Sequence, residues 1–380
     1  MGIRRNLLDF SVALMRAAYP MRRATKPVKI FVLRNNDLGD VAVITPLFQA
    51  LKNQFPDAQI VVGVCTASKD ILKHNPYVSE VADCNAPWHN HRSPGKSLTA
   101  ALGYIFRSPE VKKLQTYKFD IGIDVLGSPF GSILMMRLRI PIRLGRKGYA
   151  GGHTGATAYL ENTTTESVAK GVLGFASLLS PNAKLESDTK PQLFLSPDEV
   201  EKARHTWQEM GWNCGKSGPR IVFAPGAGVP AKQWPAEHFA ALAKRLSPQF
   251  CGCILGSRED YEAGELIREA SREWTNKCGS VTIRDSMALI SLADLLVCNS
   301  SFVMHVASGF NKPSVVVLTR ILDPTIHRFF WEVEGLHHAL YPEGDASHVS
   351  VDAVEQGVRK ALAAGTGSAA VLTALQDDVR

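Results

Sequence analysis

Short apolar runs alternate with segments of helical periodicity along almost the whole chain. The runs include KIFVL, AQIVVGVC, DIGIDVLG, RIVFAPG, FCGCILG, ADLLVCN and PSVVVLT. Their apolar residues are continuous instead of alternating with polar ones, which is typical of strands that are buried on both faces of a parallel sheet. The segments between them have the spacing and length of helices. The sequence therefore predicts an α/β fold in which helices cover parallel sheets.

One layout occurs twice in the chain. Residues 29–64 and 220–256 each contain a strand, a loop, a helix with the pattern Phe-x-Ala-Leu and a second strand. This layout is typical of the opening β-α-β unit of a Rossmann-like domain. A polar stretch with three prolines separates the two copies and predicts a domain boundary near residue 190. The predicted doubly wound domains cover residues 28–190 and 191–362, and a weakly helical tail covers 363–380.

The positive charge of the chain is concentrated at its N-terminus. The net charge is +7, and residues 1–30 hold seven Lys or Arg and one acid, Asp9, which leaves 36 basic and 35 acidic residues elsewhere. A nucleic-acid-binding domain would carry basic residues on a folded face. Nucleic acid is therefore not an expected partner.

Residues 1–27 are predicted to form a basic amphipathic arm. The stretch NLLDFSVALMRAAY is mostly apolar and is flanked by arginines, the composition of a helix at an anionic membrane surface. Asp9 and Arg16 interrupt the apolar run, so it is a poor signal peptide and too short and charged for a membrane span. The alternative is a helix docked on the protein's own body.

The cysteines and histidines give no pattern of a metal site. The seven cysteines are irregularly spaced and include no C-x-x-C pair, and several lie in apolar runs, as buried free thiols do. A reducing cytoplasm is the expected location. His89 and His91 are interpreted as part of a polar loop.

Ligands of open α/β sheets bind beyond the carboxyl ends of the strands. The loops after KIFVL, RIVFA and DLLVC are therefore the candidates, in a cleft expected between the two sheets. The first loop, RNNDLGD, lacks the G-x-G-x-x-G pattern and carries carboxylates that would repel a pyrophosphate. A nicotinamide or flavin enzyme is therefore not expected.

Asp40 lies in this first loop, at the predicted N-terminus of a helix over 42–54. Two interpretations are open. The carboxylate could cap the helix, which would contribute about 1 kcal/mol. It could instead be a general base that accepts the proton of a hydroxyl group.

Two loops in the second half together predict a diphosphate site. In FAPGAGVPAKQWP, Gly226 and Gly228 allow backbone amides to approach a ligand, and Lys232 supplies a point charge. In VCNSSFVMHVASGFNKP, Ser300 and Ser301 precede a short helix. Each loop alone has an ordinary interpretation, as a turn with a solvated lysine or as a serine cap. Their convergence in one domain favours the diphosphate.

Four blocks of the chain resemble glycosyltransferase family 9, the heptosyltransferases of bacterial lipopolysaccharide core assembly. They run in order from about residue 28 to 325 and read KIFVLRNNDLGDVAVITPLFQALKNQFPDAQIVVGV, FDIGIDVLGSPFGSILMMRLRIPIRLGRK, IVFAPGAGVPAKQWPAEHFAALAKRL and SLADLLVCNSSFVMHVASGFNKPSVVVL. The resemblance implies a GT-B fold, an ADP-heptose donor in the C-terminal domain and a lipid A–core acceptor in the N-terminal domain. It also implies inverting transfer without an obligatory metal or other cofactor, at the inner face of the bacterial cytoplasmic membrane.

The resemblance also implies roles for single residues. Asp40 matches the family's catalytic aspartate, so it is expected to cap the helix and also to act as the general base, with base catalysis favoured. Lys232 matches a lysine that stabilises the leaving diphosphate. Glu259 or Asp260 falls where the family has a ribose-binding acid. The remaining implied contacts are Asn36 and Gly39 for the acceptor, and Gly226, Ala227, Gly228, Ser300, Ser301, Phe302 and His305 for the donor.

The fourth block departs from the family pattern. Members usually have Asp-Thr/Ser-Gly before the helix, and this chain has Ser300-Ser301-Phe302, with His305 retained. The stretch TRILDP keeps only the proline of the family's Gly-Pro-Thr-x-P. Two alternative functions therefore stay open: a catalytically inactive nucleotide-binding paralogue and a GT-B-fold sugar-nucleotide epimerase.

Overall fold

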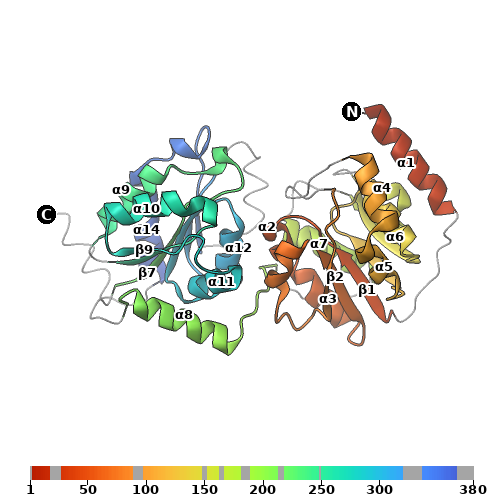
Figure 1. The fold of residues 1–380 in the computed structure, drawn as a ribbon, viewed down its shortest axis with the longest axis horizontal. Coiled ribbons are helices and arrows are strands. Elements are labelled where there is room, and N and C mark those ends of the chain that lie inside the picture. Colours follow the sequence, from red (N-terminus) through yellow and green to blue (C-terminus); the bar gives the residue numbers. More distant parts are fainter. Residues whose placement is uncertain are drawn as a thin grey trace. The chain divides into compact units, whose positions relative to one another are not determined.

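The computed structural model divides into two compact units, Met1–Gln192 and Leu193–Arg380. Each unit has one six-stranded parallel sheet surrounded by helices (Figure 1). The described residues are 2–17, 27–88, 97–147, 152–161, 167–180, 189–212, 218–247, 250–319 and 336–365. His89, His91, most of TRILDP and the tail beyond residue 365 lie outside these ranges.

The sheet of the first unit has the strand order β3-β2-β1-β4-β5-β6, which is the order of the Rossmann fold. Its strands are β1 (Lys29–Leu33), β2 (Gln59–Val64), β3 (Glu80–Asp83), β4 (Ile121–Asp124), β5 (Ile142–Lys147) and β6 (Ala158–Glu161). Its helices are α1 (Gly2–Ala17), α2 (Leu38–Ala42), α3 (Pro46–Gln54), α4 (Leu98–Arg107), α5 (Pro109–Gln115), α6 (Pro129–Arg137) and α7 (Val168–Leu179), with the 3-10 helices η1 (Thr66–Leu72) and η2 (His153–Gly155).

The strand order of the second sheet is β12-β11-β10-β7-β8-β9. It is the same Rossmann order when the sheet is read from β9 to β12 and β7 is taken as the first strand of the unit. Its strands are β7 (Arg220–Ala224), β8 (Cys251–Ile254), β9 (Trp274–Asn276), β10 (Leu295–Asn299), β11 (Ser314–Val317) and β12 (His337–Leu340). Its helices are α8 (Pro197–Glu209), α9 (Ala236–Leu246), α10 (Tyr261–Ala270), α11 (Ile283–Leu292), α12 (Phe302–Gly309) and α14 (Val351–Gly365), with η3 (Pro230–Lys232), η4 (Arg258–Asp260) and η5 (Ala346–His348). The prediction of two doubly wound parallel sheets is confirmed.

The repeated Phe-x-Ala-Leu pattern is a core pattern. Phe48 and Leu51 on α3 are fully buried, and so are Phe239 and Leu242 on α9. Phe239 packs edge-on against Phe223 of β7 with ring centroids 5.5 Å apart. The helix after the first strand of each unit therefore covers its sheet through the same pair of apolar positions.

The helix predicted over 42–54 is two helices, α2 and α3. Pro46 has no N–H to donate into a preceding turn, and it occupies the first position of α3, where that donor is not needed. Helix α2 begins earlier than predicted, at Leu38. This shift changes the position of Asp40 within its helix.

Helix α1 packs on the body of the first unit. Val12 is fully buried beside Ser132 and Gly155, and Leu8 and Met15 pack against the same core. The Asp9 carboxylate accepts a hydrogen bond from the Gly152 N–H at 3.2 Å. The alternative of a docked helix therefore holds for its inner face.

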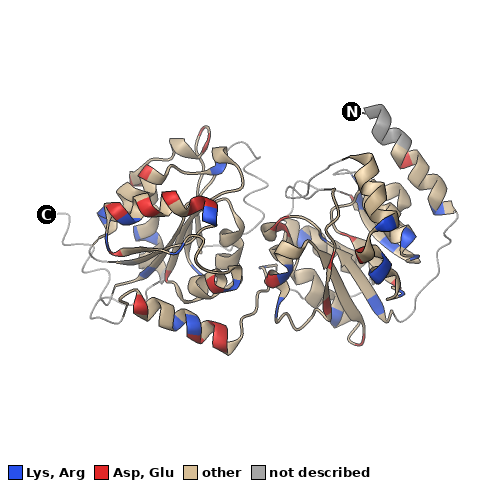
Figure 2. Ribbon diagram, in the orientation of Figure 1, with Lys and Arg blue, Asp and Glu red and all other residues tan. Residues whose placement is uncertain are grey.

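Helices α8 and α10 of the second unit carry charges of both signs. Figure 2 shows acidic and basic residues side by side on α8 and α10. No helix within the described ranges is long and apolar enough to cross a membrane. The cysteines whose side chains are described are buried free thiols, and burial raises the pKa of Cys84 and of Cys278 to about 12, so both stay protonated.

Gly127 is expected to be intolerant of a side chain. Its φ is +74°, and a Cβ placed there would lie 2.3 Å from the carbonyl oxygen of Arg146. Gly127→Ala should lower the free energy of unfolding by about 1–3 kcal/mol. Gly103→Ala is the matched control, because a Cβ on this residue of α4 meets nothing within 4 Å and should stabilise by about 0.5–1 kcal/mol. Urea denaturation measures the stability of both variants. Equal denaturation midpoints would contradict the predicted backbone strain at position 127.

Candidate functional site

The polar run that follows β1 is buried and held by hydrogen bonds. Asn35 donates from Nδ2 to the carbonyl oxygens of Ala86 and Trp88, at 3.3 and 2.7 Å. The carbonyl oxygen of Asn36 accepts from Cys65 Sγ at 3.3 Å. Buried polar groups need such partners. The loop leading to Asp40 therefore has one fixed path out of the sheet.

Asp40 does not cap its helix. The N-cap residue of α2 is Asp37, and Asp40 lies within the first turn. The Asp40 carboxylate instead accepts a hydrogen bond on Oδ1 from Arg34 Nη2 at 2.7 Å. The capping interpretation is therefore wrong, because α2 begins before the predicted start. The Asp40 side chain is 40% exposed and that of Arg34 is 7% exposed.

Asn36 and Gly39 lie in the same loop as Asp40 but differ in exposure. Asn36 is buried, whereas Gly39 is partly exposed and accepts through its carbonyl oxygen from the Val43 N–H at 3.0 Å. Gly39 therefore lies nearer to solvent, beside Asp40.

Asp124 at the end of β4 is a buried acid that the sequence reasoning missed. It lies beside Leu33 in the strand register and accepts from the N–H groups of Gly127 and Ser128, at 3.1 and 2.9 Å. Burial raises the pKa of the Asp124 carboxyl, and these hydrogen bonds and the charge of Arg34 oppose that rise. The signal in the sequence was an acid ending an apolar strand before a Gly-Ser turn.

In the second unit, Asn299 joins two of the predicted loops. It is the last residue of β10, and its Oδ1 accepts from the Trp234 N–H at 3.0 Å while its Nδ2 donates to the Pro225 carbonyl oxygen at 2.6 Å. Strands β10 and β7 are neighbours in the sheet. The loop after β7 is therefore fastened at both ends to the start of the loop after β10.

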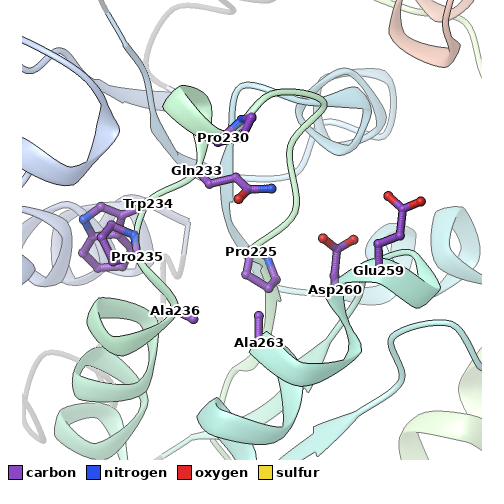
Figure 3. Close-up of a pocket in the computed structure, with 9 residues that line it drawn as sticks. All are labelled: Pro225, Pro230, Gln233, Trp234, Pro235, Ala236, Glu259, Asp260 and Ala263. Atoms are coloured by element: carbon purple, nitrogen blue, oxygen red, sulfur yellow. The ribbon is translucent and has the colours of Figure 1, made fainter. Parts of the chain in front are cut away.

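A pocket of about 240 Å³ opens between the loops after β7 and β8. Figure 3 shows Gln233, Asp260 and Glu259 among the side chains that line it. Gln233 donates from Nε2 to the carbonyl oxygen of Ala227 at 3.2 Å. The full lining consists of Pro225, Pro230, Gln233, Trp234, Pro235, Ala236, Glu259, Asp260 and Ala263.

The two candidate acids of this pocket have different surroundings. Asp260 accepts on Oδ2 from the Ser257 N–H at 2.7 Å and from Ser257 Oγ at 2.8 Å. A Cβ on Gly226 would lie 2.5 Å from the same oxygen, so Gly226 permits this close approach. Glu259 is exposed and makes no hydrogen bond or ion pair with a residue in the described ranges. Asp260 therefore fixes the loop, whereas Glu259 is available to a ligand.

The remaining predicted donor residues occupy the start of α12 and the end of η3. Ser301 is the N-cap of α12 and makes no side-chain cap hydrogen bond, and Phe302 is the first helical residue. Ser300 and His305 are buried. Lys232 is partly exposed at the end of η3 and is not among the residues that line the pocket.

The predicted site residues thus form one group in each unit. Asn36, Gly39 and Asp40 share the loop after β1. The predicted donor residues lie on the loops after β7, β8 and β10, which are adjacent strands. A loop at the carboxyl edge of a Rossmann-like sheet, where the strand order reverses, is the usual place for a ligand.

Comparisons with known proteins agree with this arrangement. Residues 110–320, more than half of the chain, match the model of glycosyltransferase family 9 (heptosyltransferase). Lipooligosaccharide heptosyltransferase 2 of Haemophilus ducreyi is 27% identical over 308 residues, which cover 76% of this chain and 82% of that protein.

Solved structures show the same fold. A glycosyl transferase of family 9 from Veillonella parvula has a TM-score of 0.73 at 19% identity and covers 90% of this chain and 99% of its own. The ADP-heptose lipopolysaccharide heptosyltransferase II of E. coli has a TM-score of 0.67 at 21% identity, with coverage of 88% and 98%. The expected GT-B class is confirmed. The chain therefore belongs to glycosyltransferase family 9, the heptosyltransferase family, and is a glycosyltransferase.

Proposed function

We propose that the protein is an inverting glycosyltransferase that moves a heptose-like sugar from ADP-heptose to a lipopolysaccharide core or a related glycan acceptor. The name lipooligosaccharide heptosyltransferase 2 supports the sugar and the acceptor, and that of the E. coli ADP-heptose lipopolysaccharide heptosyltransferase II supports the donor. Asp40 is the general base of the reaction. The observation that supports this role is that one oxygen of its carboxylate has a hydrogen-bond partner and the other has none among the described residues.

The Asp40 carboxylate has one oxygen held and one oxygen available. Oδ1 accepts from Arg34, whereas Oδ2 accepts no hydrogen bond from any residue that the structure describes. A general base needs an oxygen within hydrogen-bond reach of the hydroxyl that it deprotonates. The partial exposure of Asp40 leaves Oδ2 open to such a hydroxyl.

The proposed reaction is a direct displacement. The acceptor hydroxyl donates to Asp40 Oδ2, and its oxygen forms a bond with the anomeric carbon of the donor sugar. The bond from that carbon to the diphosphate oxygen breaks, and its electron pair stays on the leaving diphosphate. Asp40 takes the hydroxyl proton, and attack from the opposite face inverts the configuration.

Charge that develops on the leaving diphosphate needs stabilising groups. Lys232 supplies a point charge, and the backbone amides of 226–228 and 300–302 supply hydrogen-bond donors. Gly228 adds room, because a Cβ placed there would meet nothing within 4 Å. These groups would act without a metal ion.

We assign the ribose contact to Glu259. Its carboxylate is exposed at the pocket (Figure 3) and has no partner within the described ranges, so it can accept from two hydroxyl groups. Asp260 already accepts twice from Ser257. Its role in the proposal is to shape the loop against Gly226.

Helix α1 is proposed to meet an anionic membrane surface at the inner face of the cytoplasmic membrane. Its inner face is docked, but Phe10 and Leu14 are 64% and 61% exposed. Exposed apolar side chains on an amphipathic helix, next to basic residues, favour an anionic lipid surface. A membrane-bound enzyme would meet a lipid-linked acceptor where that acceptor is anchored.

Asp40→Asn should reduce the rate of heptose transfer by about 10²–10⁴-fold, because the amide cannot accept the hydroxyl proton. The assay follows transfer from ADP-heptose to a heptose-deficient lipopolysaccharide core, with ADP binding measured beside it. Asp37→Asn is the matched control, since this acid of the same loop makes no side-chain cap hydrogen bond. Loss of ADP binding in Asp40→Asn, or wild-type turnover, would refute the assignment; no transfer by the wild-type protein would favour the inactive paralogue.

Isothermal titration calorimetry should show ADP binding in preference to UDP, GDP and CMP. Glu259→Gln should weaken ADP binding by about tenfold, since hydrogen bonds to a charged acceptor contribute about 1.5–3 kcal/mol. Lys232→Ala should weaken it as well, through the lost phosphate contact. Glu269→Gln, on the far end of α10, controls for removal of an exposed acid. Equal affinity of the Glu259 and Glu269 variants would exclude the ribose contact.

Phe10→Ser combined with Leu14→Ser should reduce partitioning of the full chain onto vesicles that contain phosphatidylglycerol by at least about tenfold. These residues are exposed, so the fold should survive their replacement. Leu266→Ser, which removes an exposed apolar residue from α10, is the control. Sedimentation with the vesicles measures the bound fraction, and unchanged binding of the double variant would rule out this surface.

A further inference from the structure

Arg34 is a buried cation at the end of the central strand of the first unit. It follows β1 directly, and its N–H donates to the carbonyl oxygen of Gly63 on β2 at 2.9 Å. Its side chain is 7% exposed. A guanidinium in such a place must find partners for its charge and its donors, because desolvation is costly. Within the described ranges, both side-chain hydrogen bonds of Arg34 go to one residue, Asp40.

The two contacts hold both the main chain and the side chain of Asp40. Nη2 donates to carboxylate Oδ1 at 2.7 Å, and Nε donates to the backbone carbonyl oxygen of the same residue at 3.2 Å. The guanidinium is planar, so the positions of these donors are fixed relative to each other. A carboxylate held in this way cannot rotate freely. Oδ1 is held by Arg34, and Oδ2 has no hydrogen-bond partner among the described residues.

A second acid lies at the end of the neighbouring strand. Asp124 lies next to Leu33 in the neighbouring strand, and its charge interacts with that of Arg34. The Asp124 oxygens are held by the turn at Gly127 and Ser128. Arg34 therefore carries its charge near two carboxylates, of which Asp124 is buried and fixed and Asp40 is partly exposed.

We propose that Arg34 is a positioning residue for the transfer reaction, which orients Asp40 so that Oδ2 faces the acceptor hydroxyl. This inference rests on the proposed role of Asp40 as general base. Arg34 acts through Asp40 and does not touch the substrates. Its loss therefore lowers the turnover number and leaves the Michaelis constants for donor and acceptor unchanged.

The test is a double-mutant cycle on the full chain. Arg34→Gln should lower kcat by about tenfold to a hundredfold, the effect that outer partners of reacting groups typically have, with each KM within about twofold of the wild type. Arg34→Lys should give an intermediate kcat, since an ammonium keeps the charge but lacks the fixed fork. Arg34→Gln added to Asp40→Asn should cause no further loss of rate, because the group on which it acts is already gone.

Arg284→Gln is the matched control for loss of a buried ion pair. Arg284 lies in the second unit, where its side chain is also 7% exposed and pairs with Glu199 of the same unit. Its replacement should lower the denaturation midpoint and leave kcat unchanged. A fall in kcat equal to that of Arg34→Gln would show a general effect of lost stability and would overturn the inference.

The outcomes separate the two proposals. If Asp40→Asn keeps its rate, the proposed general base fails, and the role of Arg34 fails with it. The positioning role alone is overturned if kcat falls in Asp40→Asn but not in Arg34→Gln. It is also overturned if the two decreases in kcat multiply in the double variant. If Arg34→Gln is unfolded by circular dichroism, Arg34→Lys decides, since a wild-type kcat in that variant overturns the inference.

Discussion

Parallel pairing of the strands is the constraint on which the rest of this structure depends. All ten strand pairs described in the two units are parallel, so every strand of a sheet ends at the same edge. In both units the first strand pairs with the second and the fourth, so the connections on its two sides leave in opposite directions. Polar loops from distant parts of the chain therefore meet beside β1 and beside β7.

This edge is also where the protein buries polar groups instead of apolar ones. Arg34 and Asp124 end neighbouring strands in the first unit, and Asn299 holds the corresponding place in the second. Arg34 and Asn299 have partners in loops that belong to the predicted site, whereas Asp124 is held by the turn after its own strand. Breaking such a buried interaction is costly in free energy, because it leaves a polar group without a partner. These buried contacts hold the loops that carry Asp40 and the predicted donor residues in place.

Helix α1 is docked on the first unit through one face and keeps exposed apolar side chains on another. Leu8, Val12 and Met15 pack on the body, whereas Phe10 and Leu14 remain exposed. The apolar residues of this amphipathic helix occupy more positions than its docking face covers. Docking therefore leaves an apolar strip, and our proposal that it meets a membrane rests on this strip.

The sequence predicted the strands, the duplicated layout and the loops of interest, because apolar runs and their spacing are local properties. It failed at the start of α2, where a shift of a few residues decided whether Asp40 caps a helix. Helix ends are set by single turns and by prolines such as Pro46, so the periodicity of a longer segment does not locate them.

What the sequence by itself determined is therefore the class of fold and the family, through patterns that are read along the chain. Only the tertiary structure decided that Arg34 holds Asp40, that Asp260 is engaged by Ser257 while Glu259 is open, and that Asn299 fastens the loop after β7. For Arg34 and Asn299, the carboxyl end of one strand must lie beside another before the contacts can form. For Asp260 and Glu259, a single turn of backbone decides which carboxylate folds back onto the loop. Composition and periodicity carry no record of either.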